Sequence, residues 1–436
     1  MRSDPQVVRF DSIAYVNPAR RVRKGQPVPF IDMAALPQHS RDISPTDVGE
    51  REAKGAGAHF QNGDTLLARI TPCLENGKTA QVRCLNPGDI GEGSTEFIVL
   101  SGIDPADNDF VYYLCRTPSF REYAIGRMEG TSGRQRVAWQ AIAAYEFSCP
   151  SPDVRRAAAR ALAALDDRID LLRQTNATLE FFAQALFKSW FVDFDPVRAK
   201  QAGQEPEGMD AATAALFPAE FEESVLGLIP KGWQTATLAD AMHLNPTRSL
   251  SKGSAAPYLE MANAPTTGHR PMEPVGQRAF GSGCKFRNGD ALLAKITPCL
   301  ENGKSAFVDF LDGDEVGWGS TEFIVMRAKP VLPEYCAYLL ARHEPFRQYA
   351  IQAMTGTSGR QRVEVSRLAQ FPLALPPDNS VATATAQTFR TLQSRISAND
   401  EQAKTLADLR DVLLPRLISG KLRLPEPQEQ LEEALA

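Results

Sequence analysis

Two short stretches of the chain combine residue types that suit contact with an anion. The sequence Gly-Thr-Ser-Gly-Arg-Gln-Arg-Val occurs at 130–137 and again at 356–363. Its glycines and hydroxyl residues predict a turn that exposes backbone N–H groups, and arginine adds a planar fork of donors that fits phosphate oxygens or the edge of a guanine. The candidates for contact with nucleic acid are therefore Arg134, Gln135 and Arg136 in the first copy and Arg360, Gln361 and Arg362 in the second.

The same stretches also have a purely structural interpretation. The turn would then close its domain, and the arginines would pair with nearby carboxylates such as Glu96 and Glu322. Both interpretations are compatible with the sequence.

A second pair of stretches looks like the end of a phosphate-binding loop. Asn-Gly-Lys-Thr at 76–79 and Asn-Gly-Lys-Ser at 302–305 match that end, but Pro72 and Pro298 stand where the loop needs its first glycine. We instead expect a glycine turn between two strands, which either is structural only or lets its lysine face an anion. The basic candidates in and just before these turns are Lys78, Lys304, Arg69 and Lys295.

Composition and motifs narrow the classes of protein. No dinucleotide fingerprint follows a strand, no zinc-protease or serine-elbow motif occurs, and the five histidines are scattered, so the chain is predicted not to be an enzyme. Seven cysteines without a Cys-x-x-Cys pair fit reduced thiols, and no window approaches the ~18 apolar residues of a membrane span. These features predict a soluble cytoplasmic protein. A net charge of −5 argues against coating nucleic acid by bulk charge but leaves room for local basic surfaces.

The candidate stretches belong to a long internal repeat. Residues 63–137 align with residues 289–363 at a constant shift of 226, and 42 of the 75 positions are identical. A repeat of this length predicts two whole domains of the same fold. Short β-branched or aromatic runs between Pro, Gly and Asn breaks indicate β-rich domains. Upstream the match is looser, and residues 34–47 and 262–274, which do not align, are expected to be exposed loops.

Each domain is followed by a predicted long helix. Residues 154–194 contain no Gly or Pro and carry apolar residues four and three apart, which is the heptad pattern of a helix packed along another helix. Each copy also places one Asn in the seam, where a buried polar side chain fixes register. We expect the two helices to pair with each other; the alternative is that each lies on its own domain. The two seams are Leu165, Ile169, Leu172, Asn176, Leu179, Ala183 and Leu186, and Leu392, Ile396, Asn399, Ala403, Leu406, Arg410 and Leu413.

The remaining segments complete the predicted organisation. The stretch after the first helix is rich in Pro, Gly and acids and is expected to be a connector, and the chain ends in an acidic tail that should be frayed. The predicted divisions are 1–152 for the first domain, 153–195 for the first helix, 196–232 for the connector, 233–377 for the second domain, 378–424 for the second helix and 425–436 for the tail.

The repeated blocks occur together with LFKSWFVDFDPVRAK at 186–200 and LLPRLISGKL at 413–422. In this combination the chain resembles, over essentially its whole length, the specificity subunit of type I restriction-modification systems. The resemblance implies an α+β fold of two repeated α/β target-recognition domains, each followed by a long helix, with the helices paired as an antiparallel coiled coil.

The resemblance also implies a function and partners. Members of that family have no catalytic activity; they bind a bipartite double-stranded DNA sequence, one half-site per domain, and hold two methyltransferase subunits, joined by restriction/translocase subunits. No cofactor is expected in this chain, whereas S-adenosylmethionine is expected in the methyltransferase partner and ATP and Mg in the restriction partner. The chain lacks the Asn/Asp-Pro-Pro-Tyr/Phe methyltransferase signature, as this implies. The candidate partner-binding residues near the helix ends are Phe187, Trp190, Phe191, Leu414, Leu417 and Ile418.

The two copies are closer to each other than is common in that family. Identical residues are then candidates for fold, phosphate contact or a shared partner, and differing residues are candidates for reading bases. On this basis the unaligned loops supply the candidate base-reading residues Arg41, His39, His269 and Arg270, with residues 101–119 as a second divergent region. The alternatives in other classes are an assembly scaffold whose repeated domains bind protein and an enzyme fragment with hidden catalysis.

Overall fold

The computed structural model describes residues 6–131, 133–271, 273–357 and 359–424, so the predicted acidic tail lies outside the described residues. The chain folds into two compact units. The first unit is formed by residues 1–171 and 402–436, and the second by residues 172–401. Each unit therefore combines one copy of the repeat with one part of each long helix.

The first unit contains two four-stranded sheets, in the orders β2-β9-β6-β7 and β4-β3-β8-β5. The central strands β6 and β9 are apolar and buried, with Leu66 opposite Val99, as expected for strands covered on both faces. Helix α1 packs against these strands through Phe110 and Leu114. The elements of this unit are β1 Gln6–Arg9, β2 Ala14–Val16, β3 Pro27–Ile31, β4 Gly49–Glu52, β5 Ala58–Phe60, β6 Thr65–Ala68, β7 Thr79–Gln81, β8 Gly91–Gly93, β9 Phe97–Gly102, α1 Asn108–Arg116, α2 Pro118–Gly126, β10 Met128–Glu129, β11 Arg136–Val137, α3 Trp139–Ala143 and β12 Glu146–Cys149, with short 3-10 turns at Phe10–Ser12, Pro45–Asp47 and Pro105–Asp107.

The second unit repeats this topology. Its sheets have the orders β16-β23-β20-β21 and β18-β17-β22-β19, which are the orders of the first unit element by element. Leu292 of β20 lies opposite Val325 of β23, in the register that Leu66 and Val99 have in the first unit. The elements that belong to the repeat are α7 Leu238–Ala241, β15 Gln234–Thr237, β16 Met242–Leu244, β17 Ala255–Leu259, β18 Gly276–Ala279, β19 Cys284–Phe286, β20 Ala291–Ala294, β21 Ser305–Phe307, β22 Gly317–Gly319, β23 Phe323–Ala328, α8 Cys336–Arg342, α9 Glu344–Gln352, β24 Met354–Thr355, β25 Arg362–Val363, α10 Val365–Leu368 and β26 Pro372–Leu375.

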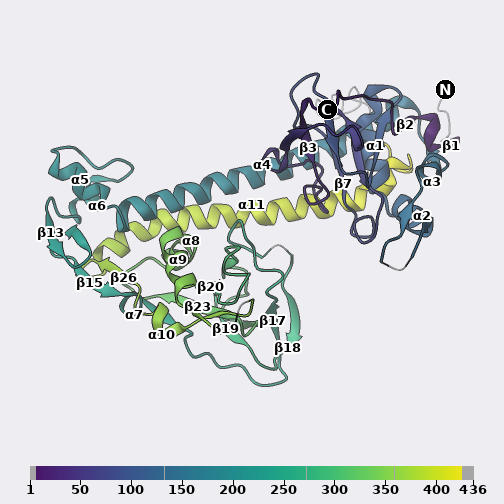
Figure 1. The fold of residues 1–436 in the computed structure, drawn as a ribbon. Coiled ribbons are helices and arrows are strands. Elements are labelled where there is room, and N and C mark those ends of the chain that lie inside the picture. The colour runs from purple at the N-terminus through teal and green to yellow at the C-terminus, as the bar shows by residue number, and fades with distance from the viewer. Residues whose placement is uncertain (1–5, 132, 272, 358, 425–436) are drawn as a thin grey trace, which may run out of the picture. The chain divides into compact units, whose positions relative to one another are not determined.

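The two long helices are α4 (Pro152–Phe191) and α11 (Ser380–Ile418). The first predicted helix continued to residue 194, but Phe194 adopts a left-handed conformation with φ of 58°, which ends the helix earlier. Within each unit the parts of α4 and α11 lie side by side (Figure 1). In the second unit Trp190 packs on Phe389 and Asn176 bonds to Asn399, so residue numbers rise along one helix as they fall along the other. The predicted antiparallel pairing is confirmed.

A buried pair of asparagines occupies the predicted seam. Asn399 Nδ2 donates to Asn176 Oδ1 at 2.8 Å, and Asn176 Nδ2 donates to Asp400 Oδ1 at 2.7 Å and to the Ile396 carbonyl oxygen at 3.1 Å. Since a one-turn slip would break all three bonds, the pair fixes the register of the helices, as the heptad pattern predicts.

The predicted connector after α4 is folded onto the second unit. It contains α5 Asp195–Gln201, α6 Ala211–Ala215 and the hairpin of β13 Phe221–Ser224 and β14 Gly227–Pro230. Phe217 is 1% exposed and belongs to the apolar core of this unit together with Val197 and Ile229. The prediction of a connector did not include this packing. The stretch is rich in Pro, Gly and acidic residues, and its few apolar residues, which anchor it to the unit, form no recognisable pattern.

The seven cysteines are free thiols. Within the described residues, no helix has both the length and the apolar character that crossing a membrane requires.

Candidate nucleic-acid interface

The repeated Gly-Thr-Ser-Gly-Arg-Gln-Arg-Val stretch connects two short paired strands in each unit. In the first unit β10 pairs with β11, with Met128 opposite Val137, and β24 and β25 pair in the same register in the second. Gly130 has φ of 131°, and a Cβ atom there would lie 2.9 Å from the Arg134 carbonyl oxygen. The first glycine is therefore required by the backbone of the turn.

The second arginine of each stretch is held by a carboxylate. Arg136 Nε lies 3.0 and 2.9 Å from the two Glu96 carboxylate oxygens, and Arg136 Nη2 lies 2.7 Å from Oε1. These hydrogen bonds, followed by the nearby charge of Arg69, hold the pKa of Glu96 below its usual value. Arg362 and Glu322 form the same bidentate pair at 2.8 to 3.0 Å. The pairing of this arginine with a carboxylate, which the structural interpretation expects, is observed in both units.

The first arginine of each stretch has a different environment. Arg134 and Arg360 are exposed, and among the described residues neither side chain forms a hydrogen bond or ion pair. The carbonyl oxygen of Arg134 accepts a bond from Arg136 Nη1 at 3.3 Å, so the fixed arginine also steadies the backbone of the exposed one. Each copy of the stretch thus presents one guanidinium to solvent next to an arginine that a carboxylate holds.

Backbone hydrogen bonds join this turn to the Asn-Gly-Lys turn. The Thr71 N–H donates to the Gln135 carbonyl oxygen at 3.0 Å, and the Gln135 N–H donates to Thr71 Oγ1 at 2.9 Å. Thr297 and Gln361 make both bonds at 3.1 Å in the second unit. The backbone of Arg69 bonds to Glu96 and Val137, and Lys295 bonds to Glu322 and Val363 in the same way. The structure therefore places the predicted residues Arg69, Gln135 and Arg136 next to one another, and Lys295, Gln361 and Arg362 in the same way.

The two turn lysines have a structural role. Lys78 Nζ donates to the carbonyl oxygens of Met33 at 2.7 Å and Ala34 at 3.4 Å. Lys304 Nζ makes the same bonds to Met261 at 2.8 Å and Ala262 at 3.0 Å. These lysines fasten the start of each unaligned loop, which corrects the prediction that they face an anion.

Three of the candidate base-reading residues are folded into their own units. Arg41 is 2% exposed and bonds to Asp42 at 2.7 Å and to Asp167 of α4 at 2.5 Å. His269 is 0% exposed, and Arg270 bonds to Asp309 at 2.8 Å. Arg41, His269 and Arg270 are therefore not placed to read bases. The loops diverge because each packs on a different stretch of helix, which sequence comparison alone does not reveal. His39 is exposed.

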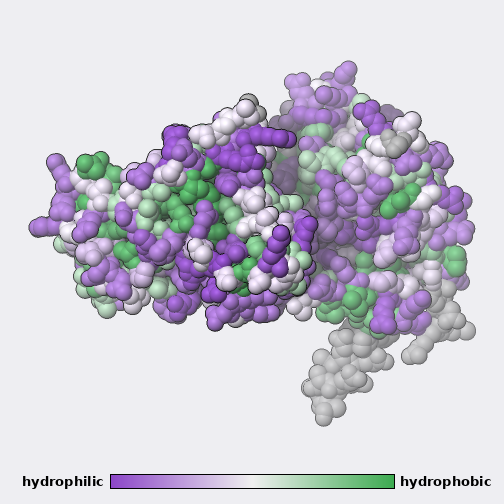
Figure 2. Space-filling model, turned by 90° about the horizontal axis from the view of Figure 1, so that it is seen from below, coloured by the Kyte–Doolittle hydropathy of each residue, from purple (hydrophilic) through white to green (hydrophobic). Residues whose placement is uncertain are grey.

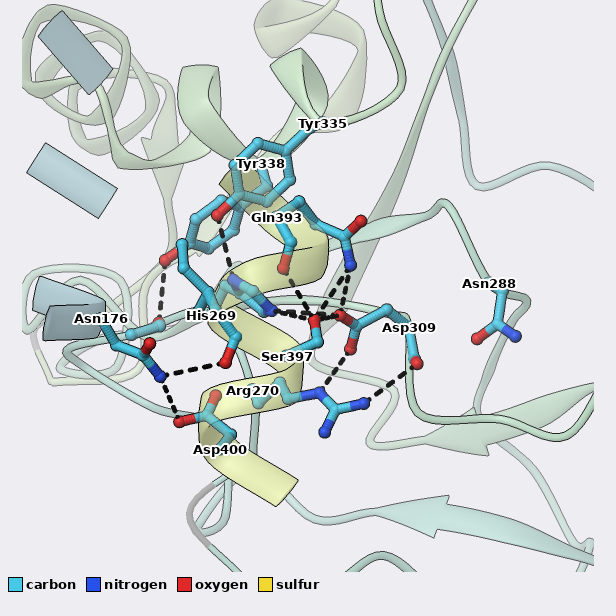
Figure 3. Close-up of polar contacts among 12 residues, drawn as sticks. Asn176, His269, Arg270, Asn288, Asp309, Tyr335, Tyr338, Gln393, Ser397 and Asp400 are labelled. Atoms are coloured by element: carbon cyan, nitrogen blue, oxygen red, sulfur yellow. Dashed lines mark hydrogen bonds and ion pairs between the residues drawn. The ribbon is translucent and has the colours of Figure 1, made fainter. Parts of the chain in front are cut away.

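A buried polar cluster surrounds His269 in the second unit (Figure 3). His269 Nε2 lies 3.1 Å from Asp309 Oδ2 and 3.3 Å from Ser397 Oγ, while Nδ1 lies 3.0 Å from the Tyr335 hydroxyl. Burial alone would raise the pKa of Asp309, but His269, Arg270 and Ser397 outweigh burial and hold this pKa well below its usual range. Because Ser397 and Asp309 meet the same ring nitrogen, the cluster lacks the relay of a catalytic triad. It joins α11 to the domain instead.

The predicted partner-binding residues of the helices are core residues. All are at most 7% exposed: Phe187, Trp190 and Phe191 lie in the core of the second unit, and Leu414, Leu417 and Ile418 lie in that of the first. Their large apolar side chains pack between the domain and the helices of their own unit. The prediction that they bind a partner is therefore corrected.

Other apolar residues of the helices are exposed. The exposed fraction is 68% for Phe181 and 52% for Phe182 on α4, and 45% for Leu409 and 63% for Val412 on α11. The helix seams align at a shift of 227, so Phe182 and Leu409 are equivalent positions of the two copies. A search of the sequence for apolar residues outside the seam would have found them. The face shown in Figure 2 is mostly hydrophilic with separate apolar patches.

The fold defines a class: an internally duplicated α/β protein in which each of two similar domains packs on its own part of an antiparallel helix pair. Comparisons with known proteins narrow this class, although no family model matches the chain. The chain is 24% identical over 427 residues to the type I restriction enzyme HindI specificity subunit of Haemophilus influenzae, covering 83% of this chain and 87% of that protein. It is 24% identical over 386 residues to the MjaIX specificity subunit of Methanocaldococcus jannaschii, covering 84% and 79%.

A solved structure shows the same fold. The S subunit of a type I restriction-modification system from M. genitalium matches with a TM-score of 0.50 and 13% identity, over 94% of this chain and 95% of that one. The predicted fold class is confirmed, and so is the resemblance to the specificity subunits of type I restriction enzymes.

Proposed function

We propose that the chain is the non-catalytic specificity subunit of a type I restriction-modification complex, and that each unit binds one half of a bipartite double-stranded DNA target. The similarity to named specificity subunits over more than four-fifths of the chain supports this assignment. The observation on this molecule that carries it is the repeated turn, which presents Arg134 in one unit and Arg360 in the other.

The chemistry of the turn fits a phosphate group. The guanidinium of Arg134 has no acceptor among the described residues and follows Gly130 and precedes the Arg136–Glu96 pair, so it can donate to phosphate oxygens. Contacts to phosphates carry no sequence information, so the same residues can make them at two half-sites whose bases differ. This explains why the turn is identical in two domains that differ elsewhere.

The methyltransferase partner would dock on the helices. We assign this contact to the exposed apolar residues Phe181 and Phe182 of α4 and Leu409 and Val412 of α11, because exposed aromatic and aliphatic side chains are typical anchors of protein interfaces. One patch in each unit, with Phe182 and Leu409 at equivalent positions, fits two methyltransferase subunits. S-adenosylmethionine would then be bound by these partners, and ATP and Mg by restriction subunits.

Binding of DNA by the chain assembled with its methyltransferase subunits tests this function. The expected affinity falls steeply with salt concentration, because each neutralised phosphate releases counterions. The purified chain alone should transfer no methyl group. An assembly whose affinity for DNA does not depend on salt would favour the protein-binding scaffold instead.

A further inference from the structure

The second unit contains a basic cavity at the end of its first sheet. The cavity has a volume of about 310 Å³. It is lined by Arg248, Arg287, Asn288, Gly313, Asp314 and Arg327. The three arginines come from three separate segments: the stretch after β16, the turn before β20, and β23 itself.

One buried carboxylate holds two of these arginines. Arg248 Nη2 lies 2.9 and 3.0 Å from the two Asp290 oxygens, and Arg327 Nη1 lies 2.8 Å from Oδ1. Asp290 is 0% exposed, so this contact is permanent rather than a solvated surface pair. Arg327 Nη2 also reaches Glu334 at 3.2 Å, and Asp314 lies in the cavity wall; both of these carboxylates are exposed and screened by water. Asp290 thus holds two guanidinium groups at once, and Arg327 has a further acceptor in the Asn288 carbonyl oxygen at 3.0 Å.

The cavity has more donors than protein acceptors. Arg287 is exposed, and within the described residues its side chain makes no hydrogen bond or ion pair, although its backbone N–H is fixed by Asp290 Oδ2 at 2.8 Å. Arg248 Nε is buried and finds no acceptor among the described residues. Guanidinium groups donate hydrogen bonds and accept none. The N–H groups of Arg287 and Arg248 that lack an acceptor would therefore suit an oxyanion as ligand.

The first unit has the equivalent Arg–Asp pair but lacks the other two arginines of the cavity. Arg20 Nη2 donates to Asp64 Oδ1 at 2.8 Å, as Arg248 does to Asp290, but Gln61 and Ser101 stand in place of Arg287 and Arg327. In the first unit the exposed cations follow Arg20 along the chain. They are Arg21, Arg23 and Lys24, whereas the second unit has Ser249, Ser251 and Lys252 at these positions. In the first unit exposed cations thus follow the paired arginine in the sequence, whereas in the second unit Arg287 lines the same cavity as the paired Arg248.

We propose that the cavity of Arg248, Arg287 and Arg327 binds a phosphate of the DNA backbone at the half-site of the second unit. The proposal rests on the proposed function. It accounts for the cations that accompany the Arg–Asp pair in both units. Each domain would bind the phosphates of its own half-site, even when the bases of the two half-sites differ. It also makes Arg287 a DNA contact without an equivalent at Gln61.

The test uses Arg287→Gln, which installs the residue that the first unit carries. The chain is assembled with its methyltransferase subunits, and affinity for target and random duplexes is measured over a range of salt concentrations. Loss of one charge-assisted contact should weaken binding to both duplexes roughly tenfold. It should also flatten the dependence of log K on log salt by about one unit. Because the Arg287 side chain is exposed and forms no hydrogen bond or ion pair with the described residues, thermal unfolding should not change.

Lys231→Gln is the control, since it removes the same charge from an exposed side chain of the same unit, on the hairpin outside the repeat. It should leave affinity and salt slope unchanged. If Arg287→Gln binds DNA as the unaltered chain does, with the same slope, the cavity is not a phosphate site, while the proposed function stands. If the variant instead loses its methyltransferase subunits, the cavity holds a carboxylate of a protein partner and the inference is overturned. Should the unaltered assembly show no salt-dependent DNA binding, the proposed function itself fails, and the inference with it.

Discussion

The two units share their sheets and their arginine turns but differ in how each domain is fastened to the helices. In the first unit, the Tyr113 hydroxyl donates to Asp166 of α4 at 2.6 Å, and Arg410 of α11 bonds to the same carboxylate at 2.5 Å. In the second unit, Tyr338 donates to Glu180 of α4 at 2.6 Å, and the His269 cluster joins the domain to α11 (Figure 3).

This difference shows that divergence between the copies has two sources. The domains meet different segments of the helix pair, so Asp309 in the second unit stands where the first has Arg83, which pairs with Asp167 at 3.2 Å. The contact with the helices is sufficient to explain why residues of this kind differ. The turn around Arg134 faces solvent, as does the turn around Arg360, and there the copies are identical.

The largest expected effect comes from breaking the helix contact of the first unit. Arg410→Ala leaves the carboxylate of Asp166 buried with only the Tyr113 hydroxyl, so we expect a loss of about 3–5 kcal/mol in the free energy of unfolding. Arg416→Ala removes the same charge from an exposed position of α11 and should have little effect. Denaturant unfolding with hydrogen exchange would locate the loss; a fall of similar size in Arg416→Ala, or protection lost mainly around Asn176, contradicts this account.

The helix contact of the second unit should be sensitive to acid through Asp309. The pKa of Asp309 is lowered in the folded chain, so the stability contributed by its ionised form is complete above its unfolded pKa of about 3.9 and is lost as pH falls below that value. Thermal unfolding between pH 3 and pH 7 should therefore depend less on pH in Asp309→Asn. An identical pH dependence in the variant and the unaltered chain would show that the cluster does not contribute in this way.

A smaller effect is expected at the asparagine pair of the seam. Asn399→Leu leaves the Asn176 side-chain oxygen without its donor in a buried position, which should cost about 1–3 kcal/mol in the free energy of unfolding. Replacing both asparagines with Leu should recover part of this loss and relax the helix register. Additive losses in the double variant would mean that the two side chains do not act as a pair.

The smallest effects are expected at the exposed arginines, and they should be equal in the two units. Arg134→Ala and Arg360→Ala should each weaken DNA binding roughly tenfold, for target and random duplexes alike, and flatten the salt slope by about one unit. Neither should alter thermal unfolding. A loss confined to the target duplex would make these arginines readers of bases, and no loss in either variant would leave the turn a structural element.

The repeat and the helices could be predicted from the sequence because both rest on local pattern. Identity at a constant shift indicates a duplicated domain, and four-three spacing of apolar residues around Asn176 and Asn399 indicates paired helices. The Arg136–Glu96 pair was also predicted, as the alternative to contact with nucleic acid. Both residues lie in blocks that are identical in the two copies.

The predictions that the structure corrects concern residues whose contacts are distant in the sequence. Arg41 meets Asp167 more than a hundred residues away, and Lys78 meets carbonyl oxygens of a loop with no recognisable pattern. The apolar side chains of Trp190 and Leu417 looked suited to a partner, but their own domains bury them. Sequence pattern identifies which residues carry charge or apolar surface, and the fold decides which of them remain exposed.

Sequencing of adenine methylation in cells with and without this chain tests the central claim that its two units bind the two halves of one DNA target. We expect a split motif, two short sequences separated by unread base pairs, that is methylated only when the chain is present. Methylated sites that are the same in both cells would contradict the account.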